Sequence, residues 1–329
     1  MKVCIAGAGA IGSLLGARLA ASGKATVSAL ARGQTLAQLR EHGWCLHTHE
    51  GLIQAPVCAS DDIADLGIPD LLIIATKGPS LSAMASTLAA CIGPRTWVLP
   101  AMNGVPWWFA QVIPALVDMS FDAIDPDGSI ARHLPAHRVI GTVVHASASV
   151  LAPGQVRHNM GNGLVIGHPP GRPAQQSSES LNSIAELLSS AGFAVRQSEN
   201  VCGDIWYKLW GNLTMNPISA LTGATGDRVL ADPLVRAFCS AAMEEAAQIG
   251  RRIGLDINET PEQRHLVTEK LGAFKTSMLQ DAEAGRALEL DNIVTIVSQI
   301  GRHLGVATPN IDAILGLTRL FGRVRGLYS

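Results

Sequence analysis

The chain has 329 residues, a net charge of −2 at pH 7 and a hydrophobic content of 47%. That length suggests about two domains of roughly 150 residues each. A nearly balanced charge gives no global attraction to nucleic acid or anionic membranes, and no apolar run is long enough to cross a bilayer. The six cysteines form no CxxC pair, which favours reduced thiols over a zinc site or disulfides. We therefore expect a cytoplasmic protein without nucleic-acid or membrane partners.

A glycine-rich turn opens the chain, between an apolar strand pattern over residues 3–6 and a helical pattern over residues 13–22. In a dinucleotide-binding loop the first glycine permits the tight turn. The second lets a pyrophosphate approach the backbone, and the third lets helix and strand pack closely. A secretory signal is the rival interpretation, but Arg18 and the three glycines argue against it. The predicted cofactor contacts are Gly7, Ala8, Gly9, Ala10, Ile11 and Gly12.

The residue that selects between NAD and NADP is expected just after the second predicted strand, residues 25–30. NAD-binding proteins place an acidic residue about 20 positions beyond the glycines, where it binds the ribose hydroxyls. Arg32 stands at that distance, and no acidic residue lies between Gly12 and Arg32. A guanidinium suits a ribose 2′-phosphate, so we expect NADP(H) as the cofactor. The alternative is an ordinary solvated loop arginine.

Two further strand ends carry candidate ligand-binding residues. Residues 69–75 read as a buried parallel strand that leads to Lys77, and residues 96–99 read as a strand that leads to Asn103-Gly104. Ligands in such sheets lie beyond the carboxyl ends of the strands, so both side chains could reach a cofactor or substrate. The alternatives are a surface lysine and a simple turn dipeptide.

Two stretches of the N-terminal half predict local features only. Residues 44–57 suit a hairpin, on which His47 and His49 would share a face. We expect no metal site there, because no third ligand stands nearby. Residues 167–178 are rich in Pro, Gly, Ser and Gln, which predicts a loop.

The order of strand and helix patterns predicts an α/β protein with two domains. Strands alternate with helices over residues 1–199, which indicates a Rossmann domain with a doubly wound sheet. From residue 200 to 329 the strand signals cease and long helical patterns follow, which predicts an all-helical C-terminal domain.

The first helix of the second half carries three polar residues, Lys208, Asn212 and Asn216, spaced by four and therefore on one face. Apolar residues surround them: Trp206, Leu209, Trp210, Leu213 and Met215. Burial lowers the pKa of a lysine, which suits proton donation near neutral pH. The alternative is a lysine that reaches solvent from an apolar helix, with the asparagines as local caps. Three polar residues on one face make that alternative the poorer account.

A later helical pattern, residues 275–291, contains Gly285, which we expect to break it. Ser277 would then lie late in one helix and Glu289 early in the next.

Taken together, these residues resemble the ketopantoate reductase (2-dehydropantoate 2-reductase) family over nearly the whole chain. The resemblance rests on the glycine motif, Arg32, Lys77, Asn103-Gly104, Trp206-Tyr207-Lys208, Asn212, Asn216-Pro217, Ser277-Met278, Gly285-Arg286 and Glu289-Leu290-Asp291. It implies a Rossmann domain followed by a helical domain, with the active site in the cleft between them.

The resemblance also implies residue roles. Lys208 would be the catalytic acid, and Glu289 would hold the hydroxyl of the substrate. The implied substrate-binding residues are Asn103, Asn212, Asn216 and Ser277, and those implied to contact NADP are Arg32 and Lys77, together with Asn103.

The implied activity is the NADPH-dependent reduction of 2-dehydropantoate to pantoate, a step of pantothenate and coenzyme A biosynthesis. The partner would be a small-molecule keto acid, with a homodimer as a possible assembly. Met102 and the bulky residues 105–108 depart from the family pattern in a loop expected to face the cleft. A reductase of a different 2-keto acid is therefore the first alternative. A non-catalytic NADP-binding regulator is the second, against which Lys208 and Glu289 speak.

Overall fold

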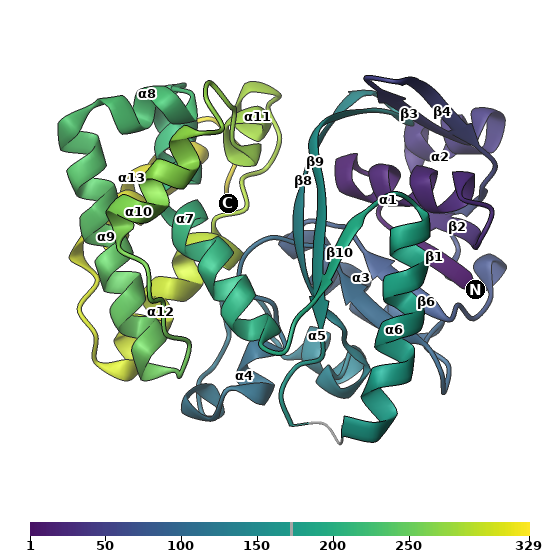
Figure 1. Ribbon diagram of the computed structural model, residues 1–329, viewed down its shortest axis with the longest axis horizontal. Helices are drawn as coiled ribbons and strands as arrows, with labels where there is room; N and C mark the ends of the chain where they lie inside the picture. Colours follow the sequence, from purple (N-terminus) through teal and green to yellow (C-terminus); the bar gives the residue numbers. More distant parts are fainter. Residues whose placement is uncertain (172–173) are drawn as a thin grey trace. The chain divides into compact units, whose positions relative to one another are not determined.

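The computed structural model describes residues 1–171 and 174–329, which fall into two compact units (Figure 1). The first unit comprises residues 1–102 and 127–204, and the second comprises residues 103–126 and 205–329. The second unit thus takes a segment from the middle of the chain. The predicted domain boundary after residue 199 stays a prediction.

The first unit contains a five-stranded sheet in which every pair is parallel. Its order is β5-β2-β1-β6-β7, so the chain moves from β1 to one side and then returns to the other. Such a reversal places a ligand site at the carboxyl ends of the central strands, here β1 and β6. The strands are β1 (Lys2–Ala6), β2 (Thr26–Leu30), β5 (Cys58–Ser60), β6 (Leu71–Ile74) and β7 (Trp97–Pro100).

A second sheet of the first unit has the order β10-β9-β3-β4, with β8 antiparallel to β9. The predicted α/β class with a helical second part is confirmed, but the sequence led us to expect one sheet. The later strands do not extend the parallel sheet, because β8 and β9 form a long hairpin that pairs with β3 and β10. The strands are β3 (Trp44–Thr48), β4 (Gly51–Ala55), β8 (Gly141–Ala152), β9 (Gln155–Gly167) and β10 (Ala194–Gln197).

Helix α1 (Ala10–Ala21) packs against strands of both sheets, and its apolar residues share one core with Trp44 and Leu46 of β3. A Cβ atom at Gly16 would lie 2.5 Å from the Trp44 ring, so this close packing needs a glycine. The other helices of the unit are α2 (Gly33–His42), α3 (Gly78–Ala89), α5 (Ser129–His133) and α6 (Ala174–Ser190). Helix α6 occupies part of the loop predicted over 167–178, and residues 172–173 of that loop lie outside the described residues.

The second unit is helical, and helix α7 (Val201–Thr222) enters it from the first. Trp210 of α7 donates a hydrogen bond to the Met243 carbonyl oxygen at 2.7 Å, which joins α7 to α9. Asp232 caps α9, and a Thr260–Gln263 capping box begins α10. The further helices are α4 (Phe109–Val112), α8 (Gly226–Ala231), α9 (Pro233–Arg252), α10 (Pro261–Glu269), α11 (Ser277–Glu283), the π-helix Asp291–Thr295, α12 (Ile296–Leu304) and α13 (Pro309–Val324).

Three observations on the described residues bear on the class of protein. Over 1–171 and 174–329, no helix combines the length and the apolar character that a membrane span requires. Within the same ranges no three His, Cys, Asp or Glu side chains gather as a metal site. All six cysteines are free, and four of them are buried.

Candidate active site

The glycine turn after β1 has the geometry of a dinucleotide-binding loop. Gly7 has a φ of +99°, and a Cβ atom there would lie 2.7 Å from Cγ2 of Thr76. A Cβ atom at Gly12 would lie 1.9 Å from the Gly7 carbonyl oxygen, so only glycine lets the helix start this close to the turn. At Gly9, by contrast, no described heavy atom lies within 4 Å of the Cβ position. The loop therefore leaves open the one glycine that a pyrophosphate approaches.

The start of α1 supplies hydrogen-bond donors beside that open position. The first helical hydrogen bond runs from Ser13 N to Gly9 O at 2.9 Å, so the amides of residues 10–12 precede the helical ladder. The first turn of α1 carries no acidic residue. Free amides and the positive end of the helix dipole favour an anion, and this loop therefore fits a phosphate-bearing cofactor.

Arg32 and Lys77 hold equivalent places on the two strands that flank β1. Arg32 follows β2 and begins α2, and Lys77 follows β6 and begins α3. Because β2 and β6 both pair in parallel with β1, their carboxyl ends border the glycine loop. The Arg32 side chain is exposed, whereas Lys77 is half-buried. The structure thus places the predicted cofactor-binding residues of the first unit at one edge of one sheet.

Lys208 and Asn103 come together within the second unit. The Lys208 ammonium on α7 donates a hydrogen bond to Oδ1 of Asn103 at 2.8 Å. Burial lowers the pKa of Lys208 from its ordinary value of 10.5 to about 8, and the Glu289 carboxylate opposes that shift. Glu289 therefore lies within the electrostatic range of the ammonium, although the two residues are far apart in sequence.

Asn103 is fixed by the turn that follows it. Gly104 has a φ of +82°, and a Cβ atom there would lie 2.1 Å from the Asn292 carbonyl oxygen. Val105 N donates to that oxygen at 2.8 Å, and Nδ2 of Asn292 donates to Val105 O at 3.2 Å. Asn292 is not among the predicted site residues, because its only signal in the sequence is a single amide within an apolar helical pattern. Its two hydrogen bonds hold the loop that presents Asn103 to Lys208.

Asn212 and Asn216 follow Lys208 by one and two turns on α7, as the spacing predicts. Asn212 is half-buried, and Asn216 is only 4% exposed. Nδ2 of Asn216 is buried and has no hydrogen-bond partner among the described residues. An unpaired buried donor is costly, so it marks a position where a bound group can supply the acceptor.

Ser277 and Glu289 lie differently from the prediction. Ser277 is the exposed first residue of α11, not a late helical residue, because the Thr276 side chain caps the helix by accepting from Leu279 N at 3.1 Å. Gly285, with a φ of +66°, follows the end of α11. Glu289 then lies in a segment without regular structure before the π-helix Asp291–Thr295, and not early in a helix.

The bulky residues after Asn103 are mostly buried, and the expectation that their loop faces a cleft stays a prediction. Val105, Trp107 and Trp108 are at most 2% exposed. Apolar side chains of this size are more stable in a core, and the segment 103–126 that carries them belongs to the second unit. Met102, the other departure, belongs to the first unit and is half-buried.

Comparison with known proteins gives one consistent result. The family profile described as "Ketopantoate reductase PanE/ApbA" matches residues 3–171, and "Ketopantoate reductase PanE/ApbA C terminal" matches residues 200–321. A 2-dehydropantoate 2-reductase of Mesorhizobium japonicum is 38% identical over 100% of both chains. A crystal structure from Ralstonia solanacearum MolK2 is 48% identical over 99% of both chains, with a TM-score of 0.93. A D-mandelate dehydrogenase solved with NADH and anilino(oxo)acetate is 22% identical, covers 99% of this chain and 100% of its own, and shares the fold with a TM-score of 0.83.

Proposed function

Because this chain belongs to the ketopantoate reductase family, we propose that it reduces 2-dehydropantoate to pantoate with NADPH. The observation that carries the chemistry is the Lys208 ammonium, held at 2.8 Å by Asn103 and with a pKa lowered to about 8. An acid with a pKa near the working pH is suited to protonating an oxygen on which negative charge develops. NADPH consumption with 2-dehydropantoate, against a panel of other 2-keto acids, tests this assignment.

The residues of the first unit fit the cofactor. We propose that the amides of residues 10–12 and the open face of Gly9 hold the pyrophosphate. The exposed guanidinium of Arg32 pairs with the 2′-phosphate, and Lys77 supplies a second positive charge at the same sheet edge. Bound NADPH supplies the hydride that adds to the carbonyl carbon of the substrate.

Lys208 supplies the proton. Its Nζ transfers a proton to the carbonyl oxygen of the substrate, which becomes the new hydroxyl group, and the resulting amine regains a proton from water. Asn103 accepts one N–H of the ammonium and so fixes its orientation. The ammonium stabilises the transition state more than the ground state, because negative charge grows on the carbonyl oxygen of the substrate during the reaction.

Four side chains position the substrate in this proposal. The buried Nδ2 donor of Asn216, with Asn212 and Ser277, binds the carboxylate by hydrogen bonds. Glu289 accepts a hydrogen bond from the distal hydroxyl, and its charge also keeps Lys208 protonated to a higher pH. Only Glu289 in this set distinguishes 2-dehydropantoate from a 2-keto acid without a hydroxyl group.

Another 2-keto acid is the alternative substrate, because partners for the carboxylate and the carbonyl serve any member of that class. The substrate panel separates the two, since a plain 2-keto acid consumed faster than 2-dehydropantoate would favour the alternative. A regulator without activity has no use for an ammonium with a lowered pKa, so Lys208 argues against that assignment.

Arg32→Ala is expected to weaken NADPH binding and leave NADH binding almost unchanged. A hydrogen bond to a charged group is worth on the order of 1.5–3 kcal/mol, so the dissociation constant for NADPH should rise about 10- to 100-fold. Fluorescence titration with both cofactors measures this. Lys24→Ala removes the same charge from an exposed site of the first unit and serves as the control. Equal NADPH affinity in the Arg32 variant and the wild type would disprove the contact.

Activity is expected to fall as the pH rises through about 8, because Lys208 must carry its proton to donate it. Glu289→Gln removes the charge that raises this pKa, so the falling limb of the kcat/KM profile should move to lower pH. The contribution of Lys208 to the free energy of unfolding changes with pH in the opposite direction. Since the folded pKa lies below 10.5, the unfolded chain binds more protons between pH 8 and 10.5, and this group makes the free energy of unfolding rise with pH. If the pH profiles of kcat/KM are identical for the wild type and Glu289→Gln, then Glu289 does not act on the pKa of Lys208.

We further propose that the protein is a cytoplasmic homodimer that associates through one face of α13. Leu317, Leu320 and Val324 are 59%, 62% and 78% exposed, and their spacing places them on one side of the helix. An exposed apolar row of this kind is typical of an interface, and a two-fold axis can bury it against its own copy. Sedimentation should show a dimer in the wild type and a monomer in Leu320→Glu. A wild-type monomer at micromolar concentration would refute the dimer.

A further inference from the structure

The segment that carries Glu289 has no regular structure of its own. Residues 286–290 of the described chain are assigned neither to a helix nor to a strand, so contacts must determine their conformation. Leu288 and Leu290 are buried on either side of the half-buried Glu289. The position of the backbone that carries the Glu289 carboxylate therefore depends on what holds its two neighbours.

The C-terminal end of the described chain provides the first restraint. Helix α13 is followed by Gly326 with a φ of +67°, and Leu327 N donates to Gly322 O at 2.7 Å, which is the Schellman arrangement. This turn brings the Leu327 carbonyl oxygen to Leu288, whose N–H donates to it at 2.9 Å. The residue directly before Glu289 is thus fixed by a backbone hydrogen bond from a segment far away in sequence.

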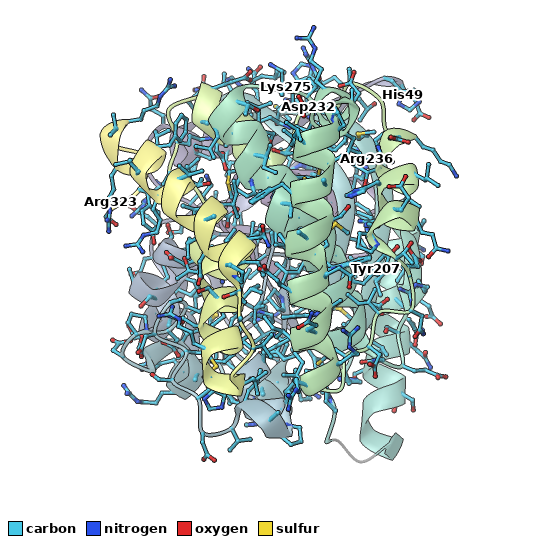
Figure 2. All side chains as sticks on the ribbon, turned by 90° about the vertical axis from the view of Figure 1, so that its left-hand side faces the viewer. His49, Tyr207, Asp232, Arg236, Lys275 and Arg323 are labelled. Atoms are coloured by element: carbon cyan, nitrogen blue, oxygen red, sulfur yellow. The ribbon has the colours of Figure 1, made fainter. Side chains whose placement is uncertain are left out.

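Tyr328 provides the second restraint. Its hydroxyl donates to Oδ1 of Asp291 at 2.7 Å, two residues after Glu289. Burial, followed by the bond to Asp291, raises the pKa of Tyr328 to about 12, so the phenol stays a donor at every pH at which the enzyme would work. A Cβ atom at Gly322 would lie 2.7 Å from Cβ of Tyr328, so α13 carries a glycine where the tyrosine crosses it. Figure 2 shows Arg323, the next residue of α13, which projects outward.

We propose that Leu327 and Tyr328 form a clamp that orients Glu289 toward the distal hydroxyl of the substrate. This inference rests on the proposed function, and it makes Tyr328 a positioning residue that contacts no substrate atom itself. The two hydrogen bonds of the clamp bracket Glu289, one residue before it and two after it. A loop carboxylate restrained on both sides loses little further freedom when the substrate binds, which favours the hydroxylated keto acid.

Tyr328→Phe tests the clamp, because it removes one oxygen atom and keeps the aromatic ring beneath the Arg323 guanidinium. We expect KM for 2-dehydropantoate to rise roughly tenfold, which corresponds to the loss of one hydrogen bond to a charged group, while kcat changes less than threefold. KM should stay unchanged for 3,3-dimethyl-2-oxobutanoate, which lacks only the hydroxyl group. An unchanged dissociation constant for NADPH and an unchanged melting temperature would show that the fold is intact.

The Glu289→Ala background separates positioning from general support of the fold. If Tyr328 acts through Glu289, then Tyr328→Phe should have no further effect on KM once Glu289 is absent. A tenfold rise that persists in that background would overturn the proposal. Arg325→Ala is the matched control, because it alters the same terminal segment at an exposed side chain that stacks on Phe321. Its KM values should equal those of the wild type.

Failure of the clamp and failure of the proposed function give different results. If Glu289→Ala raises KM for 2-dehydropantoate and Tyr328→Phe does not, the clamp is wrong and the function stands. If the wild type treats 2-dehydropantoate and 3,3-dimethyl-2-oxobutanoate alike, then the proposed substrate itself is wrong, and the clamp proposal is wrong with it.

Discussion

Lys208→Met is expected to lower kcat and kcat/KM together by about 10²–10⁴-fold, the usual loss when a general acid is removed. The ammonium acts on charge that develops only in the transition state, so KM should change little. Methionine keeps most of the length of the side chain and removes the buried charge whose pKa is lowered to about 8. The melting temperature should therefore stay the same or rise, since burial disfavours that charge. Steady-state kinetics with 2-dehydropantoate and thermal unfolding measure both effects.

Two further variants serve as comparisons for this prediction. Lys208→Arg keeps a positive charge but cannot release a proton near neutral pH, so it should lose nearly as much activity as the methionine variant. Lys270→Met removes an exposed lysine at the end of α10 and should match the wild type. A Lys208→Met enzyme with near-normal kcat would exclude Lys208 as the acid.

Gly104→Ala is expected to lower kcat/KM about 100-fold, although the glycine would touch neither substrate nor cofactor. The new Cβ atom would lie 2.1 Å from the Asn292 backbone, so the loop must move and Asn103 must leave its place beside Lys208. The free energy of unfolding should also fall, by about 1–3 kcal/mol for the positive φ and by more for the displaced hydrogen bonds with Asn292. Kinetics and urea denaturation measure the two effects.

Gly254→Ala separates the strain of the positive φ from the displacement of the loop that carries Asn103. Gly254 has a similar φ of +74°, but no described heavy atom lies within 4 Å of its Cβ position. This variant should show the strain of the positive φ in urea denaturation and keep its activity. If Gly104→Ala loses no more activity than Gly254→Ala, the turn does not position Asn103.

Some features could be predicted because they depend on residues close in sequence. The glycine turn requires φ angles and close approaches within a few residues, so its pattern of three glycines was readable. The polar face of α7 follows from helical spacing alone, which aligned Lys208 with Asn216. The Thr260 cap that begins α10 is local in the same way, since its hydrogen bonds join Thr260 to Gln263.

The remainder depends on contacts between distant segments. No local pattern shows that residues 103–126 join the helical unit, or that Asn292 holds the loop around Gly104. The start of α11 was misplaced because Thr276 could cap a helix or continue one, and the capping bond decided between them. The second sheet was missed because an extended strand does not encode its partner in its own sequence.

The interleaved layout of the chain has a consequence for its synthesis. When residue 204 leaves the ribosome, all residues of the first unit are present, but the segment 103–126, with its buried Trp107, Trp108 and Phe109, still lacks the rest of its own unit. At 5–20 residues per second the missing helices take about 6–25 s to emerge. We expect these aromatic side chains to be less well buried throughout that interval, which would make the segment a site for chaperones and for aggregation. In a truncated product that stops after the Rossmann part, the segment 103–126 would lack the rest of its unit permanently.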